Sequence, residues 1–283
     1  MGDDVEKRDP QVWNGVNFAT VHITYSSSQT WGQPTQAAPQ EIAPLATTAV
    51  VATTPATALT KTSSTETAYS TSVTESGGST STLLTSGDSS KLSKMGISGP
   101  GLNAANSSGG VWLGGDGPYT SEFANAAGED LILVVWGPDA SWVNAHTPLI
   151  TVSLPQNAKT TVSFASGSVG AWSAIYGDTQ LVNGQVSNTW AEYTMSETGV
   201  VDVSREVNMN GHTMSVVGPS CTTDMDRCVF VCSSGNVCTT GYVLQACEPG
   251  SQPGAQDGTD GNGGASGGCG GMGSSAALKT TLS

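Results

Sequence analysis

Six cysteines are the residues of this chain whose spacing most directly suggests chemistry. Five lie within 27 residues, in the pattern C-x6-C-x3-C-x5-C-x8-C, and the sixth follows in a glycine-rich segment; they are Cys221, Cys228, Cys232, Cys238, Cys247 and Cys269. Clustered cysteines without a supporting histidine indicate disulfides formed in an oxidising compartment. A zinc site, the alternative, normally uses paired C-x2-C ligands, which are absent from this pattern. We therefore predict disulfides. The connectivity stays open: four of the five clustered cysteines could pair with one another, with the fifth joining Cys269.

Other catalytic and metal-binding signatures are weak. The three histidines, His22, His146 and His212, lie far apart, and none stands at a metal-ligand spacing. We interpret them as ordinary surface or turn residues and predict neither a metal nor a cofactor. The predicted folded region, 111–248, has no G-x-S-x-G elbow, which argues against a serine hydrolase, and no Walker or dinucleotide glycine pattern.

The negative charge of the chain argues against two classes of binding partner. The net charge is −14, and the region from 111 to 248 contains 13 acidic and 3 basic residues, a net charge of −10. Without a Lys/Arg cluster, we predict binding neither to nucleic acid nor to anionic lipid. We interpret the negative charge as a feature that keeps the protein soluble outside the cell. The alternative interpretation is an acidic groove that binds neutral sugars. No feature of the sequence indicates an oligomeric state.

Composition divides the chain into four regions. Residues 1–32, with the dibasic pair Lys7-Arg8, are interpreted as a processing and pro-region motif. Residues 33–110 are rich in Ser, Thr, Pro and Ala, and their small apolar surface predicts a disordered linker. Residues 249–283 are rich in Gly and are also predicted to be disordered. The large apolar residues concentrate in 111–248, which we predict to be the folded domain.

Several features of these flanks point to secretion. The first ten residues lack the apolar segment of a signal peptide. Because the dibasic pair and the cysteines suggest the secretory pathway, we expect the signal peptide to lie upstream of Met1. No stretch approaches a membrane span, and the final residues lack the apolar tail of a lipid anchor. Asn106 begins an N-glycosylation sequon, and the Ser/Thr-rich region is either an O-glycosylated stalk or a plain linker.

The central region reads as a series of short strands. Apolar or alternating segments bounded by Gly, Pro, Ser or Asn recur at 131–136, 149–154, 160–164, 170–172, 190–195, 200–203 and 212–217. No helical apolar pattern is convincing between 116 and 217. Short strands at such spacing predict an all-β sandwich. Its tryptophans are interpreted as core or rim packing, with stacking on sugar rings as the alternative; they are Trp112, Trp136, Trp142, Trp172 and Trp190.

The order of these segments resembles two families. The run SGSVGAW followed by NTWAEYTMSETGVVDVSREVNMNGHTMSVV is similar to the thaumatin-like fold. The whole layout resembles more closely the fungal secreted family of the Aspergillus allergen Asp f four. That family combines a dibasic site, a Val/Trp-rich N-terminal motif, a Ser-rich linker and a domain with this VVxW, GAW, TWxEY and DVS order. The resemblance covers about half of the chain and implies a thaumatin-like β-sandwich in a secreted protein.

The resemblance also implies candidate site residues. Thaumatin-like proteins have an acidic cleft, and Glu192 and Asp202 match two of its acidic positions. The Arg and the other Asp residues of that cleft find no match here, which argues against hydrolysis. We therefore expect Glu192 and Asp202 to be ordinary solvent-facing residues without a catalytic role. Together with Trp172 and Trp190, they are our candidates for contact with a sugar.

Three functions follow as expectations. The first is a non-catalytic, allergen-like protein of the cell wall or extracellular space that binds a wall polysaccharide such as β-glucan. The second is a weak endo-β-1,3-glucanase that uses Glu192 and Asp202 as its acid and base. The third is a secreted effector that binds a host protein. Binding without turnover separates the first from the second.

Overall fold

The computed structural model describes residues 82–97, 99–107, 110–137, 147–260 and 263–283. The predicted processing motif 1–32 and most of the predicted linker lie outside these residues. The described residues fall within one compact unit and are mostly β-strand, with one short helix. Among them, no helix combines the length and the apolar character needed to cross a membrane.

The larger of the two main sheets has ten strands in the described part of the chain. Its main path runs in the order β1 (Thr82–Leu83), β5 (Ile150–Leu154), β4 (Leu131–Trp136), β7 (Ser168–Ile175), β10 (Trp190–Met195), β11 (Val201–Ser204), β14 (Val229–Cys232) and β15 (Tyr242–Gln245). Two further strands, β16 (Ala255–Thr259) and β17 (Ala265–Cys269), form a hairpin that joins the sheet through β11. Along one edge, β11 therefore pairs first with β17 and then with β14.

The smaller main sheet has six strands. Their order is β13 (Thr222–Thr223), β12 (Met214–Val217), β18 (Ala276–Leu282), β3 (Tyr119–Asn125), β6 (Lys159–Phe164) and β2 (Val111–Leu113). A separate two-stranded pair, β8 (Leu181–Val182) and β9 (Gln185–Val186), turns at Asn183-Gly184, where both residues have positive φ as a tight hairpin requires.

A continuous apolar core joins the two sheets. Successive strand residues point to opposite faces, so Leu131, Leu133 and Val135 of β4 enter this core, whereas the alternate residues of the strand face outward. Trp172 and Tyr193 stack at the centre of the core, with ring centroids 5.3 Å apart. Two main sheets around a shared apolar core confirm the mostly-β architecture that the sequence predicts.

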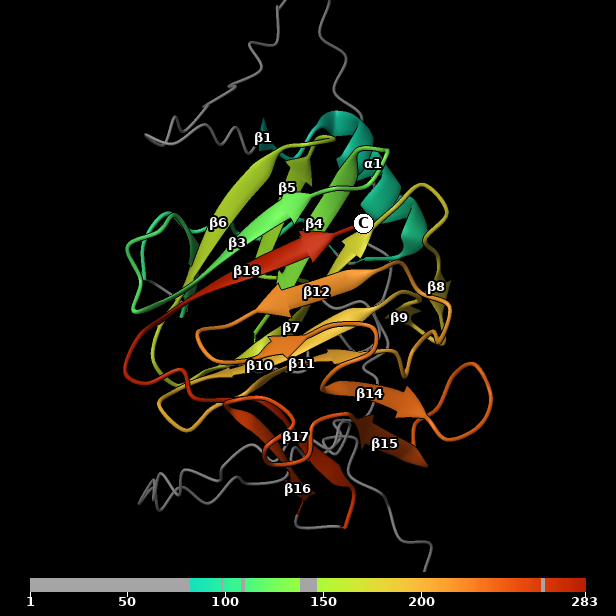
Figure 1. Ribbon diagram of the computed structural model, residues 1–283. Helices are drawn as coiled ribbons and strands as arrows, with labels where there is room; N and C mark the ends of the chain where they lie inside the picture. The colour runs from blue at the N-terminus through green and yellow to red at the C-terminus, as the bar shows by residue number, and fades with distance from the viewer. Residues whose placement is uncertain (1–81, 98, 108–109, 138–146, 261–262) are drawn as a thin grey trace, which may run out of the picture. The chain divides into compact units, whose positions relative to one another are not determined.

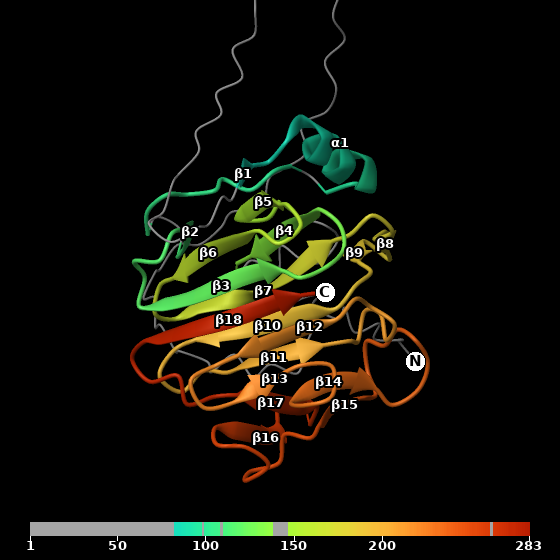
Figure 2. The ribbon, with the colours of Figure 1, turned by 45° about the horizontal axis from the view of Figure 1, so that its top comes forward.

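A second, smaller core covers part of the outer face of the larger sheet. Helix α1 (Ser86–Met95) lies beside β1 and β5 (Figure 1, Figure 2) and buries Leu92 against apolar residues of the sheet. Thr85 caps its N-terminus by accepting a bond from the Asp88 N–H, and Gly96 ends it in the left-handed conformation. Disorder was therefore the wrong prediction for residues 82–97, which local capping and burial of Leu92 hold in place.

The glycine-rich region 249–283 was also predicted incorrectly. It contains β16, β17 and β18, and β18 runs parallel to β3 near the centre of the smaller sheet (Figure 1). Leu278 and Leu282 are fully buried, because β18 alternates inward and outward residues. Gly267 has positive φ and lies so close to the Gln256 carbonyl that a Cβ there would come within 2.1 Å of its oxygen. The glycines thus permit close strand pairing, and the domain extends beyond the predicted bounds of 111–248.

Candidate functional site

Glu192 and Asp202 lie side by side on the larger sheet. Glu192 of β10 and Asp202 of β11 are direct partners in an antiparallel pair. Their chain neighbours, such as Tyr193 and Val203, enter the core between the sheets. Strand alternation therefore places both carboxyl groups on the outer face of this sheet. Cβ atoms of such cross-strand partners are about 4.5–5.5 Å apart, so the two acidic groups form a close pair.

Both carboxyl groups are buried, which corrects the expectation that they face solvent. Glu192 is 8% exposed and Asp202 is 0% exposed. Neither carboxyl oxygen of Asp202 has a hydrogen-bond partner among the described residues, and the buried Thr194 hydroxyl on the same face of β10 also lacks one there. Buried polar groups without partners are rare and costly. This face of the sheet therefore has unused hydrogen-bonding capacity.

A third acidic group, Glu206, adjoins the pair and was missed from the sequence. It follows β11 and accepts a weak bond from the Ser204 hydroxyl, 3.5 Å from its Oε1. Its backbone carbonyl accepts the Cys238 N–H at 2.9 Å, which holds it against the cysteine-rich segment. The sequence carries a sign of it, because Glu206 stands two residues after the DVS segment. We call Glu192, Asp202 and Glu206 the carboxyl cluster.

The carboxyl cluster is held toward its neutral form. Burial raises the pKa of Glu206 from an ordinary 4.5 to about 7. Burial, followed by the charges of Asp202 and Glu206, raises the pKa of Glu192 well above its ordinary value. Burial and the Glu206 charge do the same to the pKa of Asp202. Three close acidic groups cannot all ionise in a poorly hydrated place, so the cluster keeps protons that are available for donation.

The two tryptophans proposed for sugar stacking are core residues. Trp172 is 0% and Trp190 2% exposed. Trp190 stacks on Trp136 with ring centroids 5.0 Å apart and donates its indole N–H to the Val186 carbonyl. Their ring faces are covered, which confirms core packing for them and argues against a stacking platform. Trp112 and Trp136 are buried as well, and Trp142 lies outside the described residues.

His212 takes a surface role, as expected. Its Nε2 lies 2.9 Å from an Asp178 carboxyl oxygen, and its ring stacks on Tyr176 with centroids 3.7 Å apart. That hydrogen bond lowers the pKa of Asp178. His22 and His146 lie outside the described residues. Asn106, the predicted glycosylation position, is exposed.

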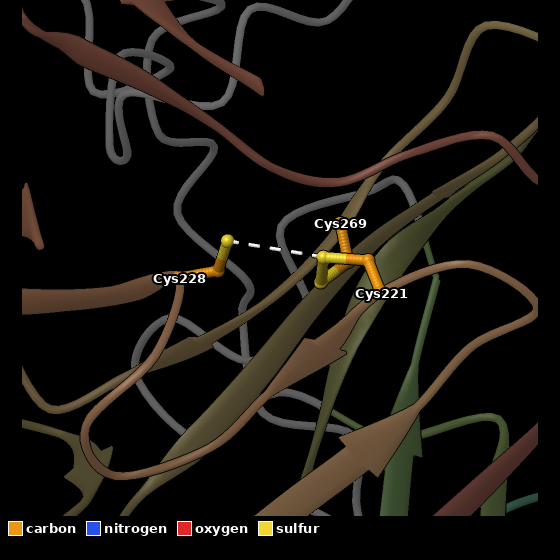
Figure 3. Close-up of side chains that lie close together, drawn as sticks. All are labelled: Cys221, Cys228 and Cys269. Carbon is orange, nitrogen blue, oxygen red and sulfur yellow. Dashed lines mark hydrogen bonds between the residues drawn. A yellow bond between two sulfur atoms is a disulfide. The ribbon is translucent and has the colours of Figure 1, made fainter. Parts of the chain in front are cut away.

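Three disulfides take up all six cysteines. The pairs are Cys221–Cys269, Cys228–Cys247 and Cys232–Cys238. This confirms the predicted disulfides and the link from the cluster to Cys269. The sulfurs of Cys221, Cys228 and Cys269 all lie within 4.8 Å of one another (Figure 3). Each belongs to a disulfide, so none is available as a thiolate ligand for zinc in this state.

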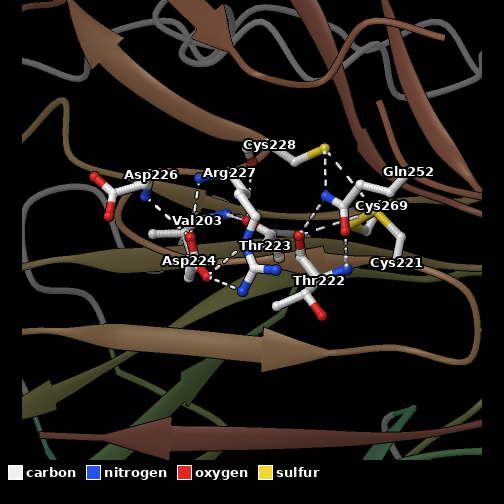
Figure 4. Close-up of polar contacts among 10 residues, drawn as sticks. All are labelled: Val203, Cys221, Thr222, Thr223, Asp224, Asp226, Arg227, Cys228, Gln252 and Cys269. Carbon is white, nitrogen blue, oxygen red and sulfur yellow. Dashed lines mark hydrogen bonds and ion pairs between the residues drawn. A yellow bond between two sulfur atoms is a disulfide. The ribbon is translucent and has the colours of Figure 1, made fainter. Parts of the chain in front are cut away.

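Hydrogen bonds fix this sulfur-rich region to the sheet (Figure 4). The Gln252 amide bonds both the N–H and the carbonyl of Thr222, at 3.0 and 2.8 Å. The Thr223 hydroxyl accepts the Val203 N–H at 2.7 Å and donates to the Cys228 carbonyl at 2.8 Å. β11, which carries Asp202, is thus tied directly to the disulfide region.

A known protein family matches the central part of the chain. The model of the allergen Asp f 4-like domain matches residues 116–262, just over half of the chain. The chain belongs to the Asp f 4-like allergen family. The matched region includes the whole carboxyl cluster and five of the six cysteines.

The folded unit of this Asp f 4-like protein extends past the match on both sides. Helix α1 and β2 precede residue 116, and β17 and β18 follow residue 262. Cys269 and the central strand β18 are therefore part of the fold although they lie outside the matched residues. No curated protein matches the chain. The three disulfides are consistent with an extracellular protein.

Proposed function

We propose that this Asp f 4-like protein is a secreted, non-catalytic protein that binds a neutral polysaccharide of the cell wall, with β-1,3-glucan as the first candidate. The observation that carries the proposal is the unused hydrogen-bonding capacity on the outer face of β10 and β11. Asp202 and Thr194 supply buried polar atoms without partners among the described residues, and Glu192 is the slightly exposed member of the pair. The hydroxyl groups of a sugar would bond to Glu192, which is 8% exposed, whereas the fully buried Asp202 would act on the ligand only by raising the pKa of Glu192.

The protonation of the cluster supports a neutral ligand. Protonated carboxyl groups both donate and accept hydrogen bonds, as sugar hydroxyls do. An anionic ligand would meet a net charge of −14 on the chain, whereas an uncharged polymer avoids that repulsion. Because the pKa of Glu206 is about 7 and that of Glu192 is raised, binding should be stronger at pH 5 than at pH 8.

The second candidate is a weak endo-β-1,3-glucanase. Direct pairing of Glu192 with Asp202 favours it, since a glycosidase needs two carboxyl groups close together. Complete burial of Asp202 argues against it, because a nucleophile has to reach the sugar ring. The third candidate, an effector that binds a host protein, is what remains if no polysaccharide is bound.

We also propose the thaumatin-like relationship that the sequence suggests. Two sheets around one core and an acidic pair on neighbouring strands support it.

The test is retention of the full, disulfide-bonded chain on insoluble β-1,3-glucan and on chitin, with reducing-sugar release measured in the same tube at pH 5. We expect retention on glucan without sugar release, and loss of retention in Glu192→Ala. Glu122→Ala is the matched control, because Glu122 is an acidic residue of the smaller sheet whose side chain is 39% exposed and pairs with Lys159. Sugar release abolished by Glu192→Ala would show an enzyme instead. If the protein is not retained and no sugar is released, a protein partner is the remaining candidate.

A further inference from the structure

Two of the three disulfides touch each other inside the protein. Cys221 Sγ lies 3.9 Å from Cys228 Sγ, although each belongs to a different disulfide (Figure 3). Cys221, Cys228, Cys247 and Cys269 are all at least 96% buried. Thiol–disulfide exchange proceeds by attack of a thiolate on a neighbouring disulfide sulfur. Sulfur contact of this kind supplies the proximity that the reaction needs.

We propose that these four cysteines form an internal exchange site in which Cys228, once released from Cys247, takes Cys221 from Cys269. A dithiol reductant first opens Cys228–Cys247; it gives two electrons and two protons and becomes a disulfide itself. The Cys228 thiolate then attacks Cys221 Sγ. The Cys221–Cys228 bond forms, the Cys221–Cys269 bond breaks, and the electron pair leaves on Cys269, which takes up a proton. The second step needs no further reductant.

Neighbouring groups hold the two reacting sulfurs in place. The Cys228 N–H bonds the Ala246 carbonyl at 3.2 Å, and its own carbonyl accepts the Thr223 hydroxyl. Gln252 fixes Thr222, the residue after Cys221, through two hydrogen bonds. The same Gln252 amide nitrogen lies 3.7 Å from Cys228 Sγ (Figure 4) and can donate to a thiolate formed there.

The exchange changes which parts of the fold are covalently tied. In the structure, Cys221 beside β13 is bound to Cys269 of β17, and Cys228 beside β14 is bound to Cys247 after β15. Cys221 and Cys228 are only seven residues apart, so a bond between them closes a short local loop. A single two-electron reduction would therefore remove the disulfide links from the β13–β14 segment to both β15 and β17.

The first test removes Cys247. In the full chain, Cys247→Ser leaves Cys228 as a free thiol beside the intact Cys221–Cys269 bond, so no external reductant is needed. The protein is alkylated at acidic pH and cleaved after Arg227 and Glu248, which separates Cys221, Cys228 and Cys269 onto three peptides. We expect the Cys221 peptide joined to the Cys228 peptide, and alkylated Cys269. A free Cys228 with Cys221–Cys269 intact would overturn the proposal.

The matched control is Cys238→Ser. It leaves Cys232 free on the same 228–248 peptide, but Cys232 is outside the group of close sulfurs. The Cys221–Cys228 linkage should exceed any cross-link in this control at least about tenfold. Equal amounts in both variants would mean random scrambling and would contradict an exchange site.

A second variant and the unaltered protein cover the case in which Cys247→Ser does not fold. Cys269→Ser leaves Cys221 free beside Cys228–Cys247, and the same contact predicts a Cys221–Cys228 bond with free Cys247. In the unaltered chain under limited dithiothreitol, the first two thiols of the four to appear should be Cys247 and Cys269. Appearance of Cys228 with Cys247, while Cys221–Cys269 stays closed, would refute the exchange.

Discussion

At the scale of single residues, the carboxyl cluster makes stability depend on pH. Glu206 has a pKa of about 7 in the folded protein, against an ordinary value of 4.5. A raised acid pKa means that the folded state holds its proton more tightly than the unfolded state. The contribution is therefore fully present below pH 4.5 and is lost as the pH rises through about 7.

We predict that the free energy of unfolding falls between pH 4.5 and pH 8, by up to about 3 kcal/mol from Glu206 alone. Glu206→Gln should flatten this part of the pH profile, because the amide does not ionise. Urea unfolding at several pH values, followed by tryptophan fluorescence, measures the effect. An unchanged slope in Glu206→Gln would show that another group is responsible.

Replacement of Asp202 or Asp224 by Asn should change stability at neutral or higher pH in opposite directions. Burial and Glu206 raise the pKa of Asp202, so Asp202→Asn should gain stability at pH 8 relative to pH 4. Burial is the largest single influence on the pKa of Asp224 and raises it, but the hydrogen bonds from Arg227 and from the Asp226 N–H, together with the Arg227 charge, outweigh burial and lower that pKa. Asp224→Asn should therefore lose stability at neutral pH and lose little near pH 3. Thermal melts of both variants at each pH compare them, and equal behaviour would contradict the assigned environments.

At the scale of elements, the strands with large apolar residues could be predicted from the sequence. The segment 131–136 agrees residue for residue with β4, and five of the other six predicted strands agree within two residues at each end. The strands β3 and β18 were missed because small or polar side chains fill many of their positions. Helix α1 was missed because Leu92 is its one buried residue, so no amphipathic period is visible.

The candidate site was predictable only in part. Glu192 and Asp202 were identified, and their pairing follows from neighbouring strands joined by a short turn. Their burial was not predictable, because it depends on which segments cover the outer face. Glu206 stands after β11 rather than on it, so strand alternation gave no indication of its direction. The burial of Trp172 and Trp190 likewise follows from sheet packing rather than from their local sequence.

The strand β18 supplies a direct test of the corrected domain boundary. Leu278 is 1% and Leu282 0% exposed, so Leu278→Ala or Leu282→Ala should each cost about 2–5 kcal/mol. The neighbouring Lys279 is exposed, and Lys279→Ala should change stability by no more than about 0.5 kcal/mol. Chemical denaturation of the three variants compares them. Equal stability in all three would indicate that residues 276–282 do not belong to the core.

At the scale of the whole molecule, an acidic, disulfide-bonded protein of two main sheets positions one carboxyl cluster that is held toward its neutral form. The charge of −14 and the three disulfides suit a protein that works outside the cell. The proposed ligand site uses the outer face of the larger sheet, whereas the proposed exchange site ties β13 and β14 to β15 and β17. The two proposals rest on different residues, and failure of one leaves the other standing.

The most direct measurement of the central claim is isothermal titration of the full chain with soluble β-1,3-gluco-oligosaccharides at pH 5 and pH 8. The account predicts saturable binding at pH 5, weaker binding at pH 8, loss of binding in Glu192→Ala and full binding in Glu122→Ala, with no new reducing ends. The same affinity in the unaltered protein and Glu192→Ala would contradict the assignment of the site. No binding at either pH would contradict the proposed function itself.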